Sequence, residues 1–299
     1  MDYHRPVMLN ECIEGLSLRP DGTYVDATYG GGGHSRAIMS RLGVGGRLLA
    51  FDQDADAAAN AIDDPRFTFV HENFRHMKAF LRLNGVRKVD GILADLGVSS
   101  HQLDVAERGF STRYEGALDL RMDQRQELTA RDIVNSADEK DLCRLFRLYG
   151  ELPNAYQMAK AVVAARANRA IETTTDLCEA VRRQLPRGLE NKYLAMLFQA
   201  LRVEVNGELD ALQALLKQAV ELLQPGGRIV VMSYHSLEDR LVKNFFKTGN
   251  FEGVLEKDFY GNPLVPLKMV TRKAVTASDD EVERNSRARS AKLRVAEMK

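Results

Sequence analysis

A chain of 299 residues, with 44% hydrophobic residues and a formal net charge of zero, is long enough for one large domain or two smaller ones. The balanced charge excludes a generally polybasic protein, so any contact with nucleic acid must come from local basic patches. Three scattered cysteines, Cys12, Cys143 and Cys178, and six histidines without metal-ligand spacing predict a reducing compartment and no metal site.

The beginning of the sequence lacks a hydrophobic signal region. No apolar run approaches ~18 residues, the length that a membrane-spanning helix needs. We therefore expect a cytoplasmic protein that does not contact a membrane.

The first third of the chain predicts alternating strands and helices. Apolar periodicity predicts helices over residues 7–16, 35–42, 55–61 and 77–84, and strands over 23–26, 47–51, 66–71 and 89–95. This alternation is typical of the α/β class, in which helices cover both faces of a parallel sheet and the ligand binds at the carboxyl ends of the strands.

The alternation stops after the fourth strand. Residues 137–148, 154–168 and 174–185 show apolar positions at helical spacing, and no strand is predicted from about residue 101 to 190. We therefore predict an inserted all-helical domain over residues 104–206, between two parts of a sheet domain at 1–103 and 207–299.

The last part of the chain returns to the sheet. A long helical pattern at 192–223, interrupted near Asn206 and Gly207, precedes a buried strand at 228–233. Residues 264–270 and 291–295 alternate and predict an antiparallel edge, whereas the polar segment 276–283 is expected to be mobile.

The stretch from Thr23 to Ser35 joins an apolar run, an acid at the strand end and four consecutive glycines that begin at Gly30. Glycines let the backbone approach a ligand closely, and the free N–H groups of the next helix favour electron-rich ligand groups. Asp26 stands where the pyrophosphate of a dinucleotide would have to lie, so a cationic ligand such as S-adenosylmethionine fits better than a nicotinamide cofactor. An ordinary strand-turn-helix connection is the alternative.

A second acid supports a nucleotide cofactor. Asp52 ends the second predicted strand about 20 residues after the glycine loop, the spacing at which a carboxylate meets ribose hydroxyls. His34 opens the helix beside the glycines, where it either contacts the cofactor or caps the helix as a neutral side chain.

Two further polar segments follow sheet strands. Asp95 ends the fourth strand, which lies next to the first in a doubly wound sheet, so its carboxylate could accept hydrogen bonds from a substrate amine; a turn cap is the alternative. His235 follows the fifth strand and could accept a proton, bind phosphate or brace a neighbour. The absence of a G-x-S-x-G elbow argues against a hydrolase.

The run from Arg284 to Arg294 contains five basic residues and no acid. We expect Arg284, Arg287 and Arg289 to contact an RNA backbone, although solvated charge is the common alternative for such a run.

Several motifs together resemble the MraW/RsmH family of bacterial methyltransferases. They are Thr28-Tyr-Gly-Gly-Gly-Gly-His-Ser35, Asp90-Gly-Ile-Leu-Ala-Asp-Leu-Gly-Val-Ser-Ser100, Gln102-Leu-Asp104, Glu107-Arg-Gly-Phe-Ser111, Leu118-Asp-Leu-Arg-Met-Asp123, His235-Ser-Leu-Glu-Asp-Arg240 and Arg287-Ala-Arg-Ser290, with His4 and Val7 near the start. The resemblance implies a class I methyltransferase fold with a helical insertion. It also implies S-adenosylmethionine-dependent methylation of the N4 amine of a decoding-centre cytidine in 16S rRNA of the small ribosomal subunit.

The resemblance implies cofactor contacts at Gly32, Gly33, His34, Asp52, Phe74, Asp95 and Gln102, with Phe74 against the adenine. Two positions depart from the common pattern, because Tyr234 stands where Phe is usual and Ser286 where Pro is usual.

Direct in-line transfer fits this target, since methylation of cytosine C5 would need a cysteine nucleophile and no cysteine lies in a loop after a predicted strand. The base would have to be presented unpaired. A nicotinamide oxidoreductase and a non-catalytic RNA-binding protein on the same scaffold are the rival classes, and the sequence leaves a homodimer open.

Overall fold

The computed structural model describes residues 6–299 and divides them between two compact units. The first unit comprises the chain up to Gly97 and from Leu209 to Lys299, and the second comprises Val98–Glu208. The sequence placed the insertion at 104–206. The prediction that touches His4 lies outside the described residues.

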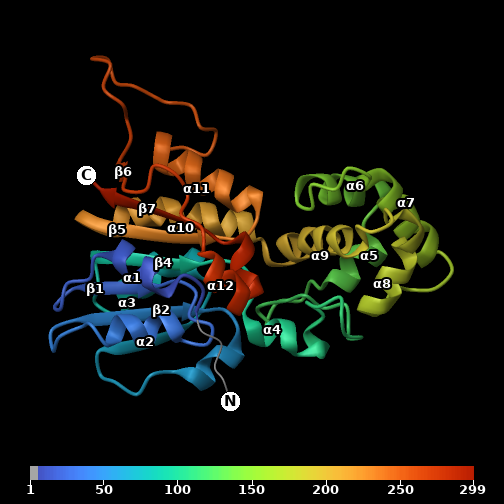
Figure 1. Cartoon of the computed structure of the whole chain (residues 1–299), viewed down its shortest axis with the longest axis horizontal. Helices are drawn as coiled ribbons and strands as arrows, with labels where there is room; N and C mark the ends of the chain where they lie inside the picture. The colour runs from blue at the N-terminus through green and yellow to red at the C-terminus, as the bar shows by residue number, and fades with distance from the viewer. Residues whose placement is uncertain (1–5) are drawn as a thin grey trace. The chain divides into compact units, whose positions relative to one another are not determined.

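The first unit is built on a seven-stranded sheet with the order β3-β2-β1-β4-β5-β7-β6 (Figure 1). β1 to β5 pair in parallel, and β7 pairs antiparallel with both β5 and β6. The strands are β1 (Thr23–Asp26), β2 (Arg47–Asp52), β3 (Phe67–His71), β4 (Val89–Asp95), β5 (Leu223–Ser233), β6 (Leu267–Met269) and β7 (Lys292–Met298). This arrangement confirms the predicted class I methyltransferase sheet and its antiparallel edge.

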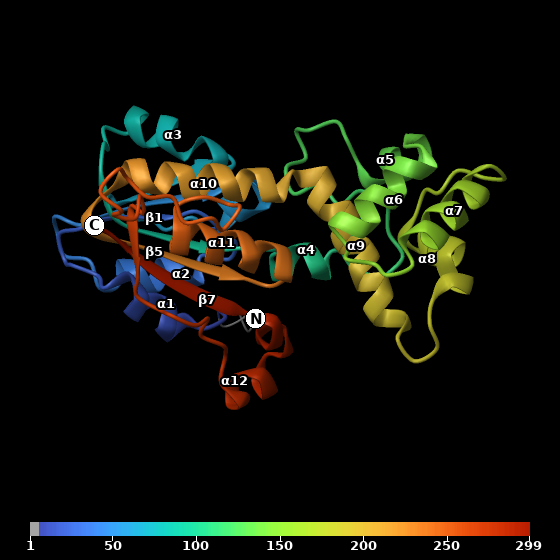
Figure 2. The ribbon, with the colours of Figure 1, turned by 90° about the horizontal axis from the view of Figure 1, so that it is seen from above.

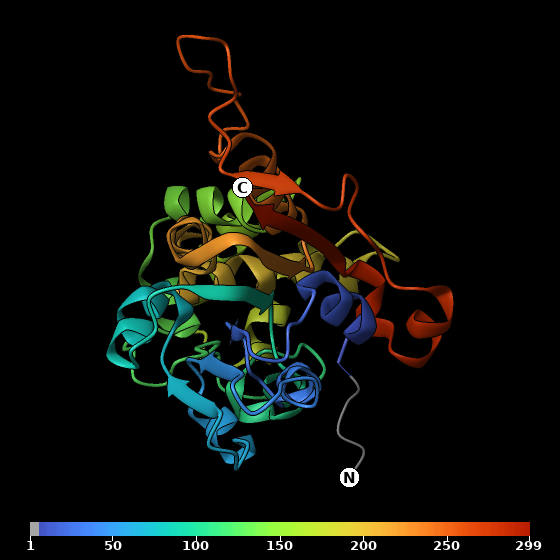
Figure 3. The same ribbon diagram turned by 90° about the vertical axis from the view of Figure 1, so that its left-hand side faces the viewer.

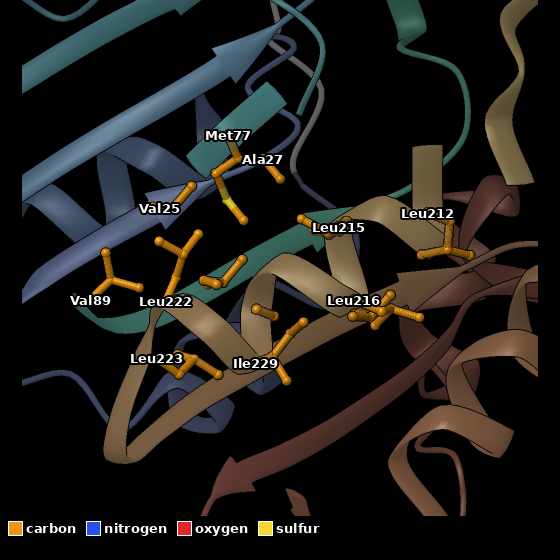
Figure 4. Close-up of a cluster of buried hydrophobic side chains, with 14 of the residues drawn as sticks. Val25, Ala27, Met77, Val89, Leu212, Leu215, Leu216, Leu222, Leu223 and Ile229 are labelled. Atoms are coloured by element: carbon orange, nitrogen blue, oxygen red, sulfur yellow. The ribbon is translucent and has the colours of Figure 1, made fainter. Parts of the chain in front are cut away.

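Helices cover both faces of this sheet. The helical segments are α1 (Leu9–Leu16), α2 (Gly33–Met39), η1 (Ala55–Asn60), η2 (Phe74–His76), α3 (Met77–Leu83), α10 (Glu208–Leu222), α11 (Ser236–Thr248), α12 (Asp279–Arg284) and η5 (Ser286–Ser290). One face packs against α3, α10 and α11, and Figure 4 shows this core with Met77, Leu215 and Ile229 converging between the sheet and α10. The opposite face packs against α1 and α2.

Burial on both faces explains why the central strands are continuously apolar. The four residues from Ile229 to Met232 in β5 are each at most 1% exposed. A polar side chain on either face of this strand would lose its hydrogen bonds to water, which destabilises the fold. Figure 2 shows β5 with α10 and α11 on the same side.

The sequence predicted no helix or strand in one polar segment. Residues 276–283 contain α12, whose N-cap Ser278 accepts the backbone N–H of Glu281, and the Glu281 Oε1 accepts the N–H of Met8 at 2.6 Å. This contact joins segments 273 residues apart, so no local pattern could reveal it. Figure 3 shows α12 in red beside α1 in blue. The predicted helix at 55–61 also forms as the shorter 3₁₀ helix η1.

The second unit is helical and has its own core. Its elements are α4 (Ser100–Asp104), η3 (Ala106–Arg108), α5 (Ala130–Ser136), α6 (Glu139–Leu148), α7 (Ala155–Arg166), α8 (Thr174–Val181), η4 (Arg182–Gln184) and α9 (Glu190–Asn206). Capping boxes start α5 at Thr129 and α8 at Thr173, and buried residues such as Phe146, Met158 and Leu197 pack between the helices.

No helix in residues 6–299 has the length and apolar character that crossing a bilayer would require.

Candidate active site

Three acids lie at the carboxyl ends of adjacent parallel strands. Asp26 ends β1, Asp52 ends β2 and Asp95 ends β4, and β1 lies between the other two. The connection order reverses between β1 and β4, which makes this edge the topological switch point where open α/β sheets bind ligands. The fold therefore assembles the three predicted acids at one edge.

The glycine loop is tied to the end of β2. The N–H of Gly30 donates to Asp52 Oδ2 at 2.7 Å, and Asp52 Oδ1 accepts the N–H of Asp54 at 2.9 Å. Burial raises the pKa of Asp52 to about 6, although these two backbone N–H groups favour its ionised form. Asp52 thus sets the position of the loop in addition to any contact it makes with a ligand.

Two of the glycines leave no room for a side chain, and one of them also has a left-handed backbone conformation. Gly32 is the N-cap of α2 with a φ of 75°, and a Cβ there would lie 2.6 Å from the Tyr29 hydroxyl oxygen. A Cβ at Gly33 would lie 2.2 Å from Cγ of Pro6. At Gly31, by contrast, a Cβ would meet no atom within 4 Å. The loop is therefore tightly packed on one side and open at its centre.

Asp26 braces the loop onto helix α2. Its Oδ2 accepts the Ser35 hydroxyl at 2.7 Å and its Oδ1 accepts the Thr28 N–H at 3.1 Å. The side chain is 1% exposed, and burial raises its pKa to about 6 against the opposing effect of these hydrogen bonds. Both oxygens already have partners, one in the loop and one in α2, so a direct cofactor contact remains a prediction.

Asp95 is held by groups from two other segments. Its backbone N–H donates to Thr28 Oγ1 at 2.7 Å, and its Oδ1 accepts the Tyr234 hydroxyl at 2.8 Å. Burial raises the pKa of Asp95 to about 7, and the hydrogen bond from Tyr234 opposes that rise. A carboxyl group with this pKa can accept or release a proton near physiological pH.

His34 approaches the same carboxylate as a neutral ring. Its Nε2 lies 3.1 Å from the Val7 carbonyl oxygen, which can only accept, so Nε2 carries the proton and Nδ1 does not. Nδ1 is 3.7 Å from Asp95 Oδ2. Burial lowers the pKa of His34 to about 4, which keeps the ring uncharged at neutral pH.

His235 lies close to a different acid. It is the N-cap of α11, and its Nε2 is 3.3 Å from Oε1 of Glu238, which is 2% exposed. Neither ring nitrogen makes a hydrogen bond with the described residues. Glu238 also accepts the Tyr234 N–H at 3.0 Å. Tyr234, the residue before His235, bonds to Asp95, whereas His235 itself lies beside Glu238. The catalytic role of His235 remains a prediction.

Phe74 begins η2 directly after β3 and packs, half-buried, against the core on the α10 face. The neighbouring Asn73 donates from Nδ2 to Gln53 Oε1 at 2.6 Å, which ties the end of β3 to the end of β2. The contact of Phe74 with an adenine remains a prediction.

Gln102 belongs to the helical unit. It completes a capping box at the start of α4, where its Oε1 accepts the Ser99 N–H at 3.0 Å and its own N–H donates to Ser99 Oγ. This accounts for its burial within the unit, and its cofactor role remains a prediction.

The basic tail divides into two kinds of arginine. Arg284 lies in α12 at 3.9 Å from Asp280, and Arg287 and Arg289 lie in η5 with Arg289 exposed. Arg294, in contrast, is 7% exposed and donates from Nε to Asp239 Oδ1 at 2.7 Å. Arg284 and Arg289 are exposed, and contact of Arg284, Arg287 and Arg289 with RNA remains a prediction.

The donor set fits S-adenosylmethionine better than a phosphate-bearing cofactor. Among the described residues, none of Asp26, Asp52 and Asp95 pairs with a lysine or arginine, and their pKa values are raised chiefly by burial. An edge lined by acids repels a pyrophosphate and accommodates a ligand that carries a sulfonium and an ammonium group. Sequence reasoning missed Thr28 and Ser35, although both are hydrogen-bonding residues next to the glycines.

Comparison with known proteins shows that the chain is similar to methyltransferases. The model of the MraW methylase family matches residues 1–299. Ribosomal RNA small subunit methyltransferase H of Flavobacterium johnsoniae is 56% identical over 99% of this chain and 98% of its own length, and that of Bacteroides thetaiotaomicron is 55% identical over 100% and 98%. A crystal structure of an rRNA methylase from Streptococcus thermophilus aligns over 100% of this chain and 99% of its own, with 10% identity and a TM-score of 0.44. The expected family and its methyl donor, S-adenosylmethionine, are confirmed.

Proposed function

Because the chain belongs to the MraW methylase family, we propose that it methylates the N4 amine of a decoding-centre cytidine in 16S rRNA. The substrate would be the small ribosomal subunit in the cytoplasm, and the names of the relatives support the RNA of that subunit as the target. The observation that carries the proposal is the position of Asp95 at the switch point, with a raised pKa and a hydrogen bond from Tyr234.

Asp95 would supply the hydrogen-bond acceptor and the base that methylation of a cytosine amine needs. The lone pair of an exocyclic cytosine amine is delocalised into the ring, which makes the amine a poor nucleophile. A carboxylate that accepts one N4 hydrogen draws the nitrogen towards a tetrahedral geometry and aims its lone pair at the methyl group. With a pKa of about 7, Asp95 can then take the proton that the nitrogen loses as it gains the methyl group.

The remaining edge would hold the cofactor. S-adenosylmethionine, when bound, supplies an electrophilic methyl group on a sulfonium. Asp52 would accept ribose hydroxyls, Phe74 would stack on the adenine, and the glycine loop from Gly30 with His34 would line the site. Asp26 and Gln102 would contribute mainly by fixing the segments that they brace, as their hydrogen bonds to Ser35 and Ser99 indicate.

The tail would bind the substrate. Arg284, Arg287 and Arg289 lie on a segment that packs beside α1, where Met8 and Glu281 are joined. Contacts of this kind to phosphates would add affinity without sequence preference.

The test is to incubate the purified protein with radiolabelled S-adenosylmethionine and small subunits that lack the modification. The labelled nucleoside is then identified by mass spectrometry. The proposal predicts N4-methylcytidine at one position. Cofactor binding without transfer to any nucleoside would contradict the proposal and would mean either that the substrate is a different RNA or that the chain is a non-catalytic RNA-binding protein.

A further inference from the structure

Tyr234 carries a hydroxyl that reaches the carboxylate of Asp95. We propose that Tyr234 is a positioning residue that fixes the Asp95 carboxylate and holds it in its ionised form for methyl transfer. This inference rests on the role proposed for Asp95.

The ring of Tyr234 is held in place from two sides. Gly97, with a φ of 95°, leaves room for it, since a Cβ at Gly97 would lie 3.3 Å from Cδ2 of the ring. The ring also packs, half-buried, against the core on the α1 face, and the backbone N–H of Tyr234 donates to Oε2 of the buried Glu238 at 3.0 Å. The hydroxyl therefore reaches Asp95 from a fixed position rather than as the end of a mobile side chain.

The hydrogen bond makes the two carboxylate oxygens of Asp95 different from each other. Oδ1 accepts the Tyr234 hydroxyl at 2.8 Å, whereas Oδ2 lies on the side of His34, 3.7 Å from Nδ1. Burial and the neighbouring Asp95 raise the pKa of Tyr234 above its ordinary value, so the phenol stays protonated and acts only as a donor. Oδ2 is thus the oxygen left to accept a substrate hydrogen.

The charged surroundings of Asp95 otherwise favour its protonated form. Asp26 at the end of β1 and Glu238 in α11 are acids that raise the pKa of Asp95 in addition to burial. His34 in α2 is neutral at physiological pH, and burial raises the pKa of Cys12 in α1 so that its thiol is also neutral. The hydrogen bond from Tyr234 opposes all of these effects.

The direct test replaces the hydroxyl alone, in Tyr234→Phe, and measures the titration of Asp95 by ¹³C NMR of carboxyl-labelled aspartate, assigned with Asp95→Asn. Because a hydrogen bond to a charged group is lost, the Asp95 pKa should rise by about one unit. In a plot of single-turnover rate against pH, the acid limb should shift to higher pH by the same amount. At pH 7 the variant would be about 5-fold slower, and the difference would close near pH 9.

Tyr24→Phe is the matched control. Tyr24 is a buried tyrosine in β1 whose hydroxyl oxygen accepts the Arg19 N–H at 2.6 Å, and its loss should leave the Asp95 titration and the pH profile unchanged. An unchanged Asp95 titration in Tyr234→Phe, or the same shift in Tyr24→Phe, would overturn the inference. A wild-type protein that transfers no methyl group to cytidine would overturn the proposed function, while the NMR titration would still measure the effect of the Tyr234 hydroxyl.

Discussion

The hydroxyl oxygen of Thr28 accepts the backbone N–H of Asp95 at 2.7 Å, a contact that joins the loop after β1 to the end of β4. Asp26 binds the same loop through the Thr28 N–H. The strand end that carries Asp95 and the segment that leads into the glycines are therefore fixed to each other by one side chain.

Removal of this contact should impair both stability and transfer. Thr28→Val keeps the shape of the side chain but leaves the Asp95 N–H without its partner, which should cost about 1–3 kcal/mol of unfolding free energy. The rate of methyl transfer should also fall, because the end of β4 that carries Asp95 is no longer fixed to the loop after β1. Thr28→Ser, which retains the oxygen, should behave like the wild type in urea unfolding and in single turnover; equal losses in both variants would contradict this explanation.

Asp52 should be needed for cofactor affinity. Asp52→Asn replaces one of the oxygens that accept Gly30 and Asp54 N–H groups by an amide NH₂, which loosens the loop and removes the charge facing the ribose. We expect the dissociation constant for S-adenosylmethionine to rise about 10- to 100-fold, measured by calorimetry.

Asp64→Asn provides the control for Asp52, because Asp64 pairs with Arg66 in the turn before β3 and contacts neither the loop nor β2's final residue. Its affinity for the cofactor should equal that of the wild type. A normal dissociation constant in Asp52→Asn would rule out the proposed role.

The buried acids should make stability fall as pH rises. Asp95 has a folded pKa of about 7 against an ordinary 3.8, so the folded state binds more protons between these values, and the contribution of Asp95 is greatest below pH 4 and is lost as pH passes 7. Asp95→Asn removes this dependence. The variant should therefore gain stability relative to wild type between pH 5 and pH 8, by at most about 3 kcal/mol. The 22% exposure of the side chain reduces that figure.

Urea unfolding of both proteins at pH 5 and pH 8 measures this gain. His34 must be kept unchanged, because its lowered pKa has the opposite effect and adds stability as pH rises from about 4 to 6.5. A difference between the two proteins that is constant with pH would show that Asp95 has an ordinary pKa.

The arginines of the tail should separate into RNA-binding and structural residues. Arg289→Ala should weaken binding to small subunits with little change in the melting temperature. The slope of the logarithm of the binding constant against the logarithm of the salt concentration should become shallower by about one. Arg294→Ala should instead destabilise the fold, because it leaves Asp239 without its 2.7 Å partner. Filter binding at several salt concentrations and thermal unfolding distinguish the two.

Much of this site follows from the sequence because parallel strands bring their carboxyl ends together. Asp26, Asp52 and Asp95 could each be placed at a strand end from local apolar runs, and the sheet then assembles them. The bond from Tyr234 to Asp95 spans 139 residues and depends on the depth at which the ring packs beside Gly97. No periodicity encodes that depth.

His235 shows the same limit. Its motif marked a polar segment after β5, but the sequence could not show that the ring lies 3.3 Å from Glu238, three residues further along α11. Helix α12 was missed for a related reason, since its segment is polar and acidic and the contact of Glu281 with the N–H of Met8 lies 273 residues away in the sequence.

The most direct test of the role of Asp95 is the single-turnover rate of N4 methylation in Asp95→Asn, with the dissociation constant for S-adenosylmethionine measured on the same sample. Asn keeps an oxygen for the Tyr234 hydroxyl and the backbone N–H for Thr28, but it cannot take a proton. We predict a rate about 100-fold or more below that of the wild type, with cofactor affinity within about 3-fold. An unchanged rate, or a loss explained entirely by weaker cofactor binding, would show that Asp95 does not act on the amine.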